Sequence, residues 1–193
     1  MRESVMERKT KETNIRLKLV IDGSNRTSID TGIPFFNHML AAFAFYAGFD
    51  LELLAQGDLE LDDHHTVEDT GILLGRALNE ALGNKAGIAR FSENLTPMDE
   101  SLVRVVLDIS NRPFCLFSAG FRRETIGGLS LENIREFLVA FSTEARLTLH
   151  VEVLYGENDH HKAEAIFKGL GRALKQACRT ESAAIPSTKG TLS

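Results

Sequence analysis

The chain carries two copies of one histidine-containing segment, and this duplication restricts the folds that it can adopt. Residues 63–68 read DHHTVE and residues 159–164 read DHHKAE, 96 positions further on. At the same offset, the tetrapeptide GRAL at residues 75–78 recurs at residues 171–174. Two related segments in one chain indicate two units of similar secondary structure that share a core.

Each copy shows the same predicted order of elements: strand, strand, helix, strand, helix. Apolar and polar residues alternate from residue 14 to 21, which predicts a half-buried strand. The turn signal Asp-Gly-Ser-Asn that follows predicts that a short strand pairs back onto it. The predicted strands span residues 14–21, 27–31, 51–54, 102–109, 114–118 and 148–154. The predicted helices span residues 35–47, 63–82, 131–146 and 159–178, and Asp63 is expected to cap the second of them.

This order of elements favours an α+β fold. We expect an internally duplicated two-layer domain, in which helices pack on one side of a mixed β-sheet. A single domain over residues 1–193 would then consist of two repeats, about 1–95 and 96–180, and a C-terminal tail, 181–193. The tail is rich in Ser, Thr and Ala and lacks periodicity, so it should be either disordered or ordered by a partner.

Composition excludes several classes of partner. A net charge of -5 argues against a nucleic-acid partner, which would select a basic surface. The sequence has no apolar stretch of about 18 residues, so we expect no membrane span. The two cysteines lack metal-binding spacing and fit a reducing compartment, which predicts a cytoplasmic location.

The paired histidines predict a metal site. Six histidines in 193 residues would give about 0.2 adjacent pairs by chance, whereas this chain has two. The alternative to a metal site is that both histidine pairs lie at solvent-exposed helix starts, where the helix dipole favours acidic neighbours. Against it, His64 and Glu68 are separated by four positions and share one helix face, as do His160 and Glu164.

The second histidine of each pair points about 100° away from the first, so one pair should serve two ions. In a duplicated fold, each site would take His and Glu from one repeat and the second histidine from the other. Imidazole and carboxylate ligands fit Mn²⁺, Fe²⁺ or Zn²⁺, and the lack of nearby cysteine disfavours structural zinc. One predicted ligand set is His64, Glu68 and His161, with Glu136 as the fourth ligand. The other is His160, Glu164 and His65, with His38 as the fourth.

His38 and Glu136 enter these sets because they occupy matching positions of the two predicted first helices. His150 alternates with buried positions on its predicted strand, together with Glu152. We therefore interpret His150 as a surface or interface residue rather than a ligand.

Several motifs resemble the imidazoleglycerol-phosphate dehydratase family. They are DHHTVEDT, NDHHKAEA, FFNHML, IPSTKG and the N-terminal RKTKET, and they cover essentially the whole chain in the family's order. One departure is Glu136, where the family commonly has histidine.

The resemblance implies a Mn²⁺-dependent removal of water from imidazoleglycerol phosphate, which gives imidazoleacetol phosphate in histidine biosynthesis. Two Mn²⁺ ions per active site would bind the imidazole ring and favour its imidazolate form. It also implies a shell of 24 subunits built from trimers, with active sites between chains. Glu12 is implied as the acid/base. The implied substrate-binding residues are Glu12, Arg90, Arg112, Lys168, Ser187, Thr188 and Lys189.

Two other functions are compatible with the same ligands. One is a binuclear metal hydrolase that acts on a phosphorylated metabolite. The other is a metal-stapled assembly protein, in which the ions only hold subunits together. The tail motif and the two arginines discriminate against the second, because a staple has no need of a phosphate site.

Overall fold

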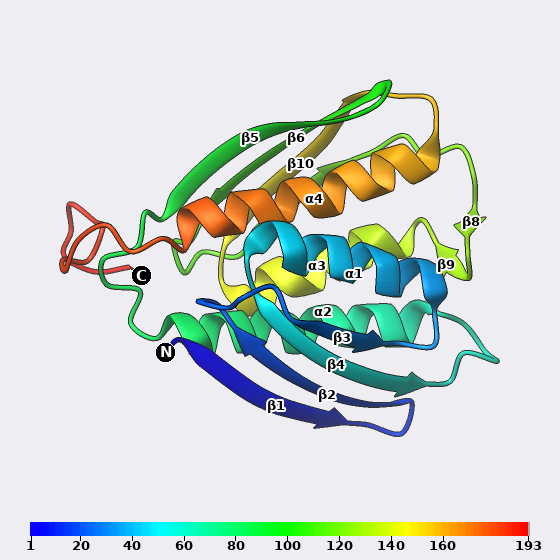
Figure 1. Cartoon of the computed structure of the whole chain (residues 1–193), viewed down its shortest axis with the longest axis horizontal. Helices are drawn as coiled ribbons and strands as arrows, with labels where there is room; N and C mark the ends of the chain where they lie inside the picture. Colours follow the sequence, from blue (N-terminus) through cyan, green and yellow to red (C-terminus); the bar gives the residue numbers. More distant parts are fainter. Residues whose placement is uncertain (193) are drawn as a thin grey trace.

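Two four-stranded sheets enclose a layer of helices in the computed structural model, which describes residues 1–192 (Figure 1). The first sheet has the order β1 (Glu3–Lys9), β2 (Thr13–Val20), β4 (Asp50–Gly57), β3 (Thr27–Asp30). The second has the order β5 (Phe91–Met98), β6 (Ser101–Asp108), β10 (Thr148–Tyr155), β7 (Phe114–Ser118). The helices are α1 (Pro34–Ala47), α2 (His64–Leu82), α3 (Asn133–Ala145) and α4 (Asp159–Ala177). A short two-stranded ribbon, β8 (Thr125–Ile126) with β9 (Leu129–Ser130), lies between β7 and α3 in the chain.

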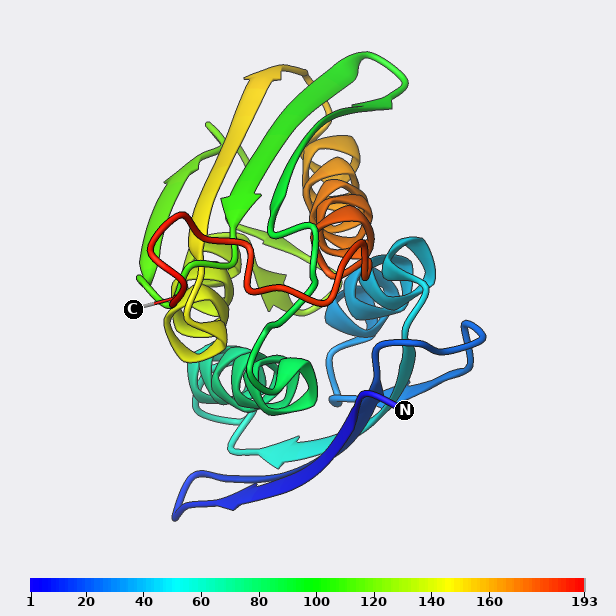
Figure 2. The same cartoon turned by 90° about the vertical axis from the view of Figure 1, so that its left-hand side faces the viewer.

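The two halves have the same topology, which confirms the duplicated α+β fold. In each sheet the first three strands pair antiparallel with one another, and the fourth strand pairs in parallel with the third. Each sheet carries its helices on one side only, and the halves meet helix against helix (Figure 2). The mixed sheet with helices on one side is therefore present once in each repeat.

The repeat unit has one strand more than predicted. β1 and β5 each form an edge of their sheet, and their fully buried side chains are small and polar: Ser4 in β1, and Ser92 and Thr96 in β5. An edge strand needs little apolar surface, so these strands give a weak hydrophobic signal. Since β5 begins at Phe91, the expected boundary between residues 95 and 96 falls inside a strand.

The predicted hairpin between residues 14–21 and 27–31 is wrong. β3 pairs in parallel with β4, not with β2. The reason is Asp50 at the start of β4, whose carboxylate accepts the backbone N–H groups of Ser24 and Arg26 at 2.6 and 2.9 Å. The loop after β2 therefore wraps around the start of β4 and carries β3 to the far edge of that strand.

The expected cap of α2 is also wrong. Asp63 makes no capping hydrogen bond; instead, its carboxylate accepts the backbone N–H of Ser130 and the side-chain amide of Asn133, at 2.7 and 3.0 Å. Asp62 takes the capping place, because its carboxylate accepts the backbone N–H of His64 at 2.7 Å. Asp63 thus fixes the start of α3 to the start of α2.

The tail, which was predicted to be disordered or ordered by a partner, lies against the chain itself. Gly87 donates its backbone N–H to Ala184 at 2.7 Å, and Arg90 donates to the carbonyl of Pro186 at 2.7 Å. Near the end, the Asn111 side chain donates to the carbonyl of Leu192 at 2.7 Å. The tail crosses the end of the molecule at which α4 finishes (Figure 2). Ser193 lies outside the described residues.

Glycines at matching positions allow the helices to approach closely. A Cβ atom on Gly75 of α2 would lie 2.5 Å from the carbonyl oxygen of Phe141 in α3. A Cβ atom on Gly171 of α4 would lie 2.4 Å from the carbonyl oxygen of Phe43 in α1. The duplicated GRAL motif is therefore a packing motif that joins each repeat's second helix to the other repeat's first helix.

Alanine at Gly75 or Gly171 is expected to destabilise the protein. Alanine favours a helix over glycine, but relief of the backbone clash should reduce the free energy of unfolding by about 1–3 kcal/mol. Urea unfolding with matched slopes would measure the change. Glu80→Ala, at an exposed position of α2, is the control and should change stability by less than about 0.5 kcal/mol. Gly75→Ala or Gly171→Ala proteins more stable than the wild type would contradict this account of the packing.

Candidate metal-binding and active site

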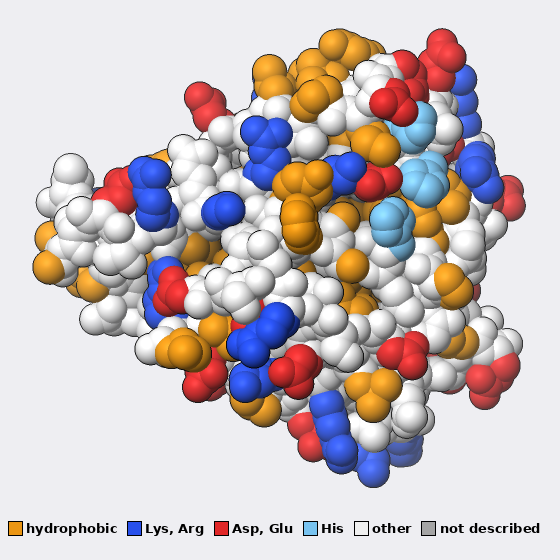
Figure 3. Space-filling view, in the orientation of Figure 1, with side chains coloured by type: hydrophobic (Ala, Val, Ile, Leu, Met, Phe, Trp, Pro, Cys, Tyr) orange, Lys and Arg blue, Asp and Glu red, His pale blue; other side chains and the backbone are white. Residues whose placement is uncertain are grey.

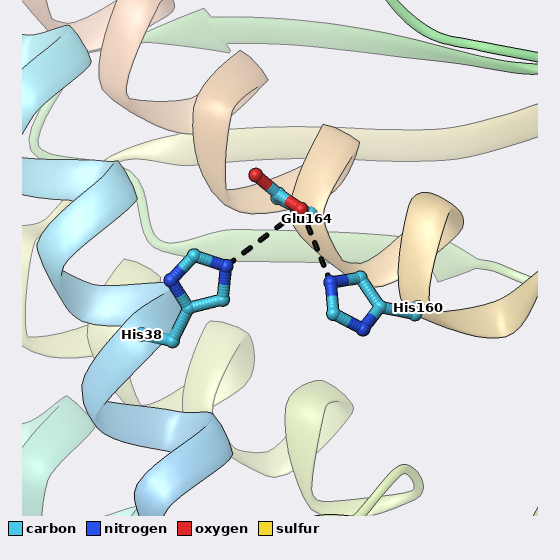
Figure 4. A group of neighbouring side chains, drawn as sticks. All are labelled: His38, His160 and Glu164. Carbon is cyan, nitrogen blue, oxygen red and sulfur yellow. Dashed lines mark hydrogen bonds and ion pairs between the residues drawn. The ribbon is translucent and has the colours of Figure 1, made fainter.

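Side chains from both repeats converge at one end of the helical layer. His38 projects from α1, and His160 and Glu164 project from α4 toward it (Figure 4). The Glu164 carboxylate oxygen Oε2 lies 3.2 Å from Nε2 of His160 and 3.7 Å from Nε2 of His38. Within residues 1–192, these are the three His, Cys, Asp or Glu side chains found with ligand atoms all within 4.8 Å of one another.

Local structure explains the convergence. Pro34 begins α1, and Asn158 caps α4 by accepting the backbone N–H of His160 at 2.9 Å. Since α4 begins there, His160 and Glu164 fall on adjacent turns of one face. The Phe35 ring packs edge-on against the His160 ring, with 5.0 Å between centroids.

Glu164 is held as a carboxylate. Burial raises the pKa of Glu164, but the Lys168 ammonium at 2.8 Å and the two histidines outweigh burial, so the pKa is lowered overall. The predicted substrate residue Lys168 therefore lies beside the histidine cluster and contacts its carboxylate.

In the first repeat, the side chains of the matching residues His64 and Glu68 are 41% and 42% exposed, whereas that of Glu164 is 11% exposed. Nε2 of His64 lies 3.7 Å from the Glu68 carboxylate, as the four-residue spacing predicts. Glu136, the expected fourth ligand, pairs with Arg135 at 2.8 Å and is not grouped with them among the described residues. Its ligand role stays a prediction.

The second histidine of each pair faces a different set of carboxylates. The rings of His64 and His65 are inclined at 77°, and those of His160 and His161 at 81°. Nε2 of His65 lies 3.9 Å from the predicted acid/base Glu12, which occupies the exposed turn between β1 and β2. Neither His65 nor His161 joins the cluster of His38, His160 and Glu164 within one chain, so the predicted exchange of ligands requires another copy.

Hydrogen bonds to carboxylates raise the pKa of His65 and of His161. The pKa of His65 is raised, first by its hydrogen bond to Asp58 and then by the charge of Glu12. The pKa of His161 is raised by its hydrogen bond to Glu100 and by the charge of Asp99. Both rings therefore carry a proton more readily than a free histidine does.

The predicted phosphate residues gather at the opposite end of the molecule. Arg90 forms a two-pronged ion pair with Asp108, at 2.7 and 3.1 Å, and its remaining guanidinium nitrogen donates a hydrogen bond to the carbonyl of Pro186 in the tail. Arg112 lies 3.4 Å from the same carboxylate, and its side chain is 58% exposed. The tail residues of this group are Ser187, Thr188 and Lys189.

The two groups of residues are separated by the length of α4. His160 lies in its first turn, and Arg90 donates its backbone N–H to Ala177 at its end. At 1.5 Å per residue the separation is about 26 Å. Histidine side chains are seen at one end of the surface, and the tail lies at the other (Figure 3).

His150 faces outward from β10, where the Phe114 ring lies 5.7 Å away. This position on the outer face of the sheet agrees with its interpretation as a surface residue. Among residues 1–192, no helix is long and apolar enough to cross a membrane.

Four polar residues near the histidines were missed by the sequence analysis. They are Asp58, Asp99, Glu100 and Asn133. Aligning the turn before β2 with the turn before β6 would have found one of them, because Glu12-Thr13 corresponds to Glu100-Ser101. The other three have no counterpart in the repeat that would have indicated them.

Comparison with known proteins identifies the family. The sequence model described as "Imidazoleglycerol-phosphate dehydratase" matches residues 31–174. The chain belongs to the imidazoleglycerol-phosphate dehydratase family. This membership confirms the resemblance of the motifs and favours a dehydratase over the hydrolase and metal-staple alternatives.

Whole-chain relatives agree with this family. An imidazoleglycerol-phosphate dehydratase of Azorhizobium caulinodans is 53% identical, with 100% of this chain and 99% of that protein covered. One of Clostridioides difficile is 51% identical, with both chains covered completely. The crystal structure of the Staphylococcus aureus enzyme superposes with a TM-score of 0.84 at 39% identity, over 92% of this chain and 99% of that chain. The Pyrococcus furiosus enzyme, in complex with (S)-C348, gives a TM-score of 0.84 at 40% identity, over 97% of this chain and 100% of that chain.

Proposed function

We propose that this protein removes water from imidazoleglycerol phosphate to give imidazoleacetol phosphate, a step in histidine biosynthesis. Family membership supports the reaction. The observation that carries the proposal is the convergence of His38, His160 and Glu164 from the two repeats. The two cysteines are free, which fits the reducing cytoplasm in which we expect the enzyme to act.

The residues present fit a divalent cation. Two imidazoles and a carboxylate meet within 4.8 Å, and this mixture of N and O donors suits Mn²⁺. His38, His160 and Glu164 would hold one ion with His65 of another copy. His64 and Glu68 would hold the second, with His161 and Glu136 as the remaining proposed ligands. When bound, such ions supply Lewis-acid stabilisation of charge on the imidazole ring.

The chain's own residues then move protons and orient the substrate. The proton that must leave sits on the carbon beside the imidazole, and the exposed carboxylate of Glu12, 3.9 Å from Nε2 of His65, would accept it. Glu12 would then return that proton to the substrate hydroxyl, which departs as water, so the proton taken from carbon and the hydroxyl leave together as one molecule of water. Lys168 keeps Glu164 ionised and fixed while this happens.

A complete site needs more than one copy of the chain. The phosphate would be bound by Arg112, Ser187 and Lys189, with Thr188 in the same turn and Arg90 holding the tail in place. Forked guanidinium donors and a lysine ammonium suit a phosphate. The distance of about 26 Å to His160 exceeds the length of a small phosphorylated imidazole. This supports active sites between chains, in the proposed shell of 24 subunits built from trimers.

Metal removal tests the proposal. Protein treated with a chelator and verified as metal-free by elemental analysis should lose dehydration of imidazoleglycerol phosphate by at least about 100-fold, and added Mn²⁺ should restore it. The product can be followed by liquid chromatography coupled to mass spectrometry, since it is one water lighter than the substrate. Undiminished turnover by verified metal-free protein would show that the reaction does not use these residues as metal ligands.

A further inference from the structure

In three of the four histidines that form the two pairs, Nδ1 makes a hydrogen bond to a side-chain oxygen from another part of the fold. Nδ1 of His64 lies 3.1 Å from Oδ1 of Asn133. Nδ1 of His65 lies 3.0 Å from Asp58, in the loop that follows β4. Nδ1 of His161 lies 2.7 Å from Glu100, in the turn between β5 and β6. The repeats reach the same arrangement with three different residues from three different segments.

The chemistry of these oxygens fixes the tautomer of each ring. Ionised carboxylates accept hydrogen bonds and cannot donate them, so Nδ1 of His65 and of His161 must carry the hydrogen. Asn133 is oriented by its amide, which donates to Asp63 at 3.0 Å, so its oxygen faces His64. A neutral imidazole with hydrogen on Nδ1 keeps its free lone pair on Nε2. All three rings are thereby prepared to bind through Nε2.

The supporting residues are themselves anchored. The second carboxylate oxygen of Glu100 accepts the backbone N–H groups of Glu157 and Asn158 at 3.1 and 2.8 Å. This ties the β5–β6 turn to the loop from which α4 begins. Asn133 is 3% exposed and shares Asp63 with the backbone of Ser130. Such fixed partners are what a histidine ligand needs to hold its ring in place.

The duplication also separates two roles for the carboxylate before the second strand of each sheet. Glu12 and Glu100 are equivalent in sequence, but Glu12 lies on the Nε2 side of His65, 3.9 Å away, while Asp58 takes Nδ1. The Glu100 carboxylate instead accepts hydrogen bonds from Nδ1 of His161 and from two backbone N–H groups. Only Glu12 is therefore left free to meet a substrate.

We propose that Asp58, Glu100 and Asn133 are positioning residues that hold His65, His161 and His64 with Nε2 directed at a bound divalent cation. The identity of that cation rests on the proposed function. The equivalence of Glu12 and Glu100 does not make Glu100 a second acid/base, because its carboxylate is committed to the histidine and the backbone.

Mn²⁺ binding to the metal-stripped full-length protein tests this inference without measuring turnover. Glu100→Ala should raise the Mn²⁺ dissociation constant by about 10–100-fold, measured from the electron paramagnetic resonance signal of free Mn²⁺. Glu100→Gln keeps an oxygen that accepts from Nδ1 and should recover most of the affinity. Glu157→Gln alters an exposed neighbour that contacts Glu100 only through its backbone, and should bind as the wild type does.

A second variant, Asp58→Ala, and a second measurement, the Co²⁺ spectrum, distinguish a lost positioning residue from a folding defect. Asp58→Ala should weaken Mn²⁺ binding similarly, whereas Glu60→Ala in the same exposed loop should not. The visible spectrum of the Co²⁺-loaded protein should change in Glu100→Ala and Asp58→Ala while the melting temperature of the metal-free protein stays within a few degrees. Unchanged affinity and unchanged Co²⁺ spectra in both alanine variants would overturn the inference and leave the proposed function standing. Wild-type protein that binds no Mn²⁺ would overturn both.

Discussion

Replacing Glu164 by glutamine is expected to lower kcat/KM for imidazoleglycerol phosphate by at least about 100-fold, equivalent to about 2.7 kcal/mol of transition-state stabilisation. Glutamine has nearly the same volume, so packing of α4 is retained. It removes the negative charge that faces His38, His160 and Lys168 at 3.7, 3.2 and 2.8 Å. Steady-state kinetics at saturating Mn²⁺, together with Mn²⁺ titration, would measure the loss.

Glu144→Gln provides the matched control. Glu144 also lies on a helix and forms an ion pair, with Arg76 at 2.9 Å, but it is not part of the histidine cluster. Its variant should keep kcat/KM within about twofold, as expected of a surface substitution away from the site. Equal losses in both variants would mean that Glu164 acts through general stability rather than through the cluster.

Mixing two inactive variants is expected to restore activity. The first is Glu164→Gln, and the second combines Arg112→Ala with Lys189→Ala at the other end of the molecule. Each should have at most about 1% of wild-type activity when assembled alone, because each removes charged contacts to a metal or a phosphate. If one active site takes its histidine cluster and its phosphate group from different copies, random co-assembly leaves about a quarter of the sites intact.

The experiment requires that subunits exchange. The variants would be stripped of metal, mixed and reassembled with Mn²⁺, and co-assembly would be verified by retrieving one tagged variant with the other. Recovery of about a quarter of wild-type activity supports sites shared between copies. Verified mixed assemblies that remain inactive would show that the two groups of residues serve the same site from one chain.

Local patterns in the sequence predicted most of the secondary structure. The stripe of Phe36, Leu40, Phe43 and Ala47 is buried in α1, at most 3% exposed, as its spacing indicates. The second helix of each repeat was predicted from its start signal, Asp63 or Asp159. β1 and β5 were missed because these edge strands bury small polar side chains, Ser4, Ser92 and Thr96, and so show no apolar alternation to detect.

The candidate site was predictable where its parts lie on one helix. His160 and Glu164 are neighbours because four residues make about one helical turn, which holds in any fold that keeps the helix. The approach of His38 to this pair was inferred from the duplication alone. Its distance of 3.7 Å from Glu164 follows from the packing of α1 against α4 at Gly171.

The sequence by itself determined the duplication, the α+β class and the family resemblance, because each follows from short-range spacing or from the order of motifs. Only the tertiary structure decided that β3 pairs with β4, that Asp63 ties two helix starts together, and that the tail rests on residues 87–90. It also decided that Glu12 is free while Glu100 is committed. These outcomes depend on contacts between residues far apart in the chain, and such contacts leave no periodicity for a local pattern to reveal.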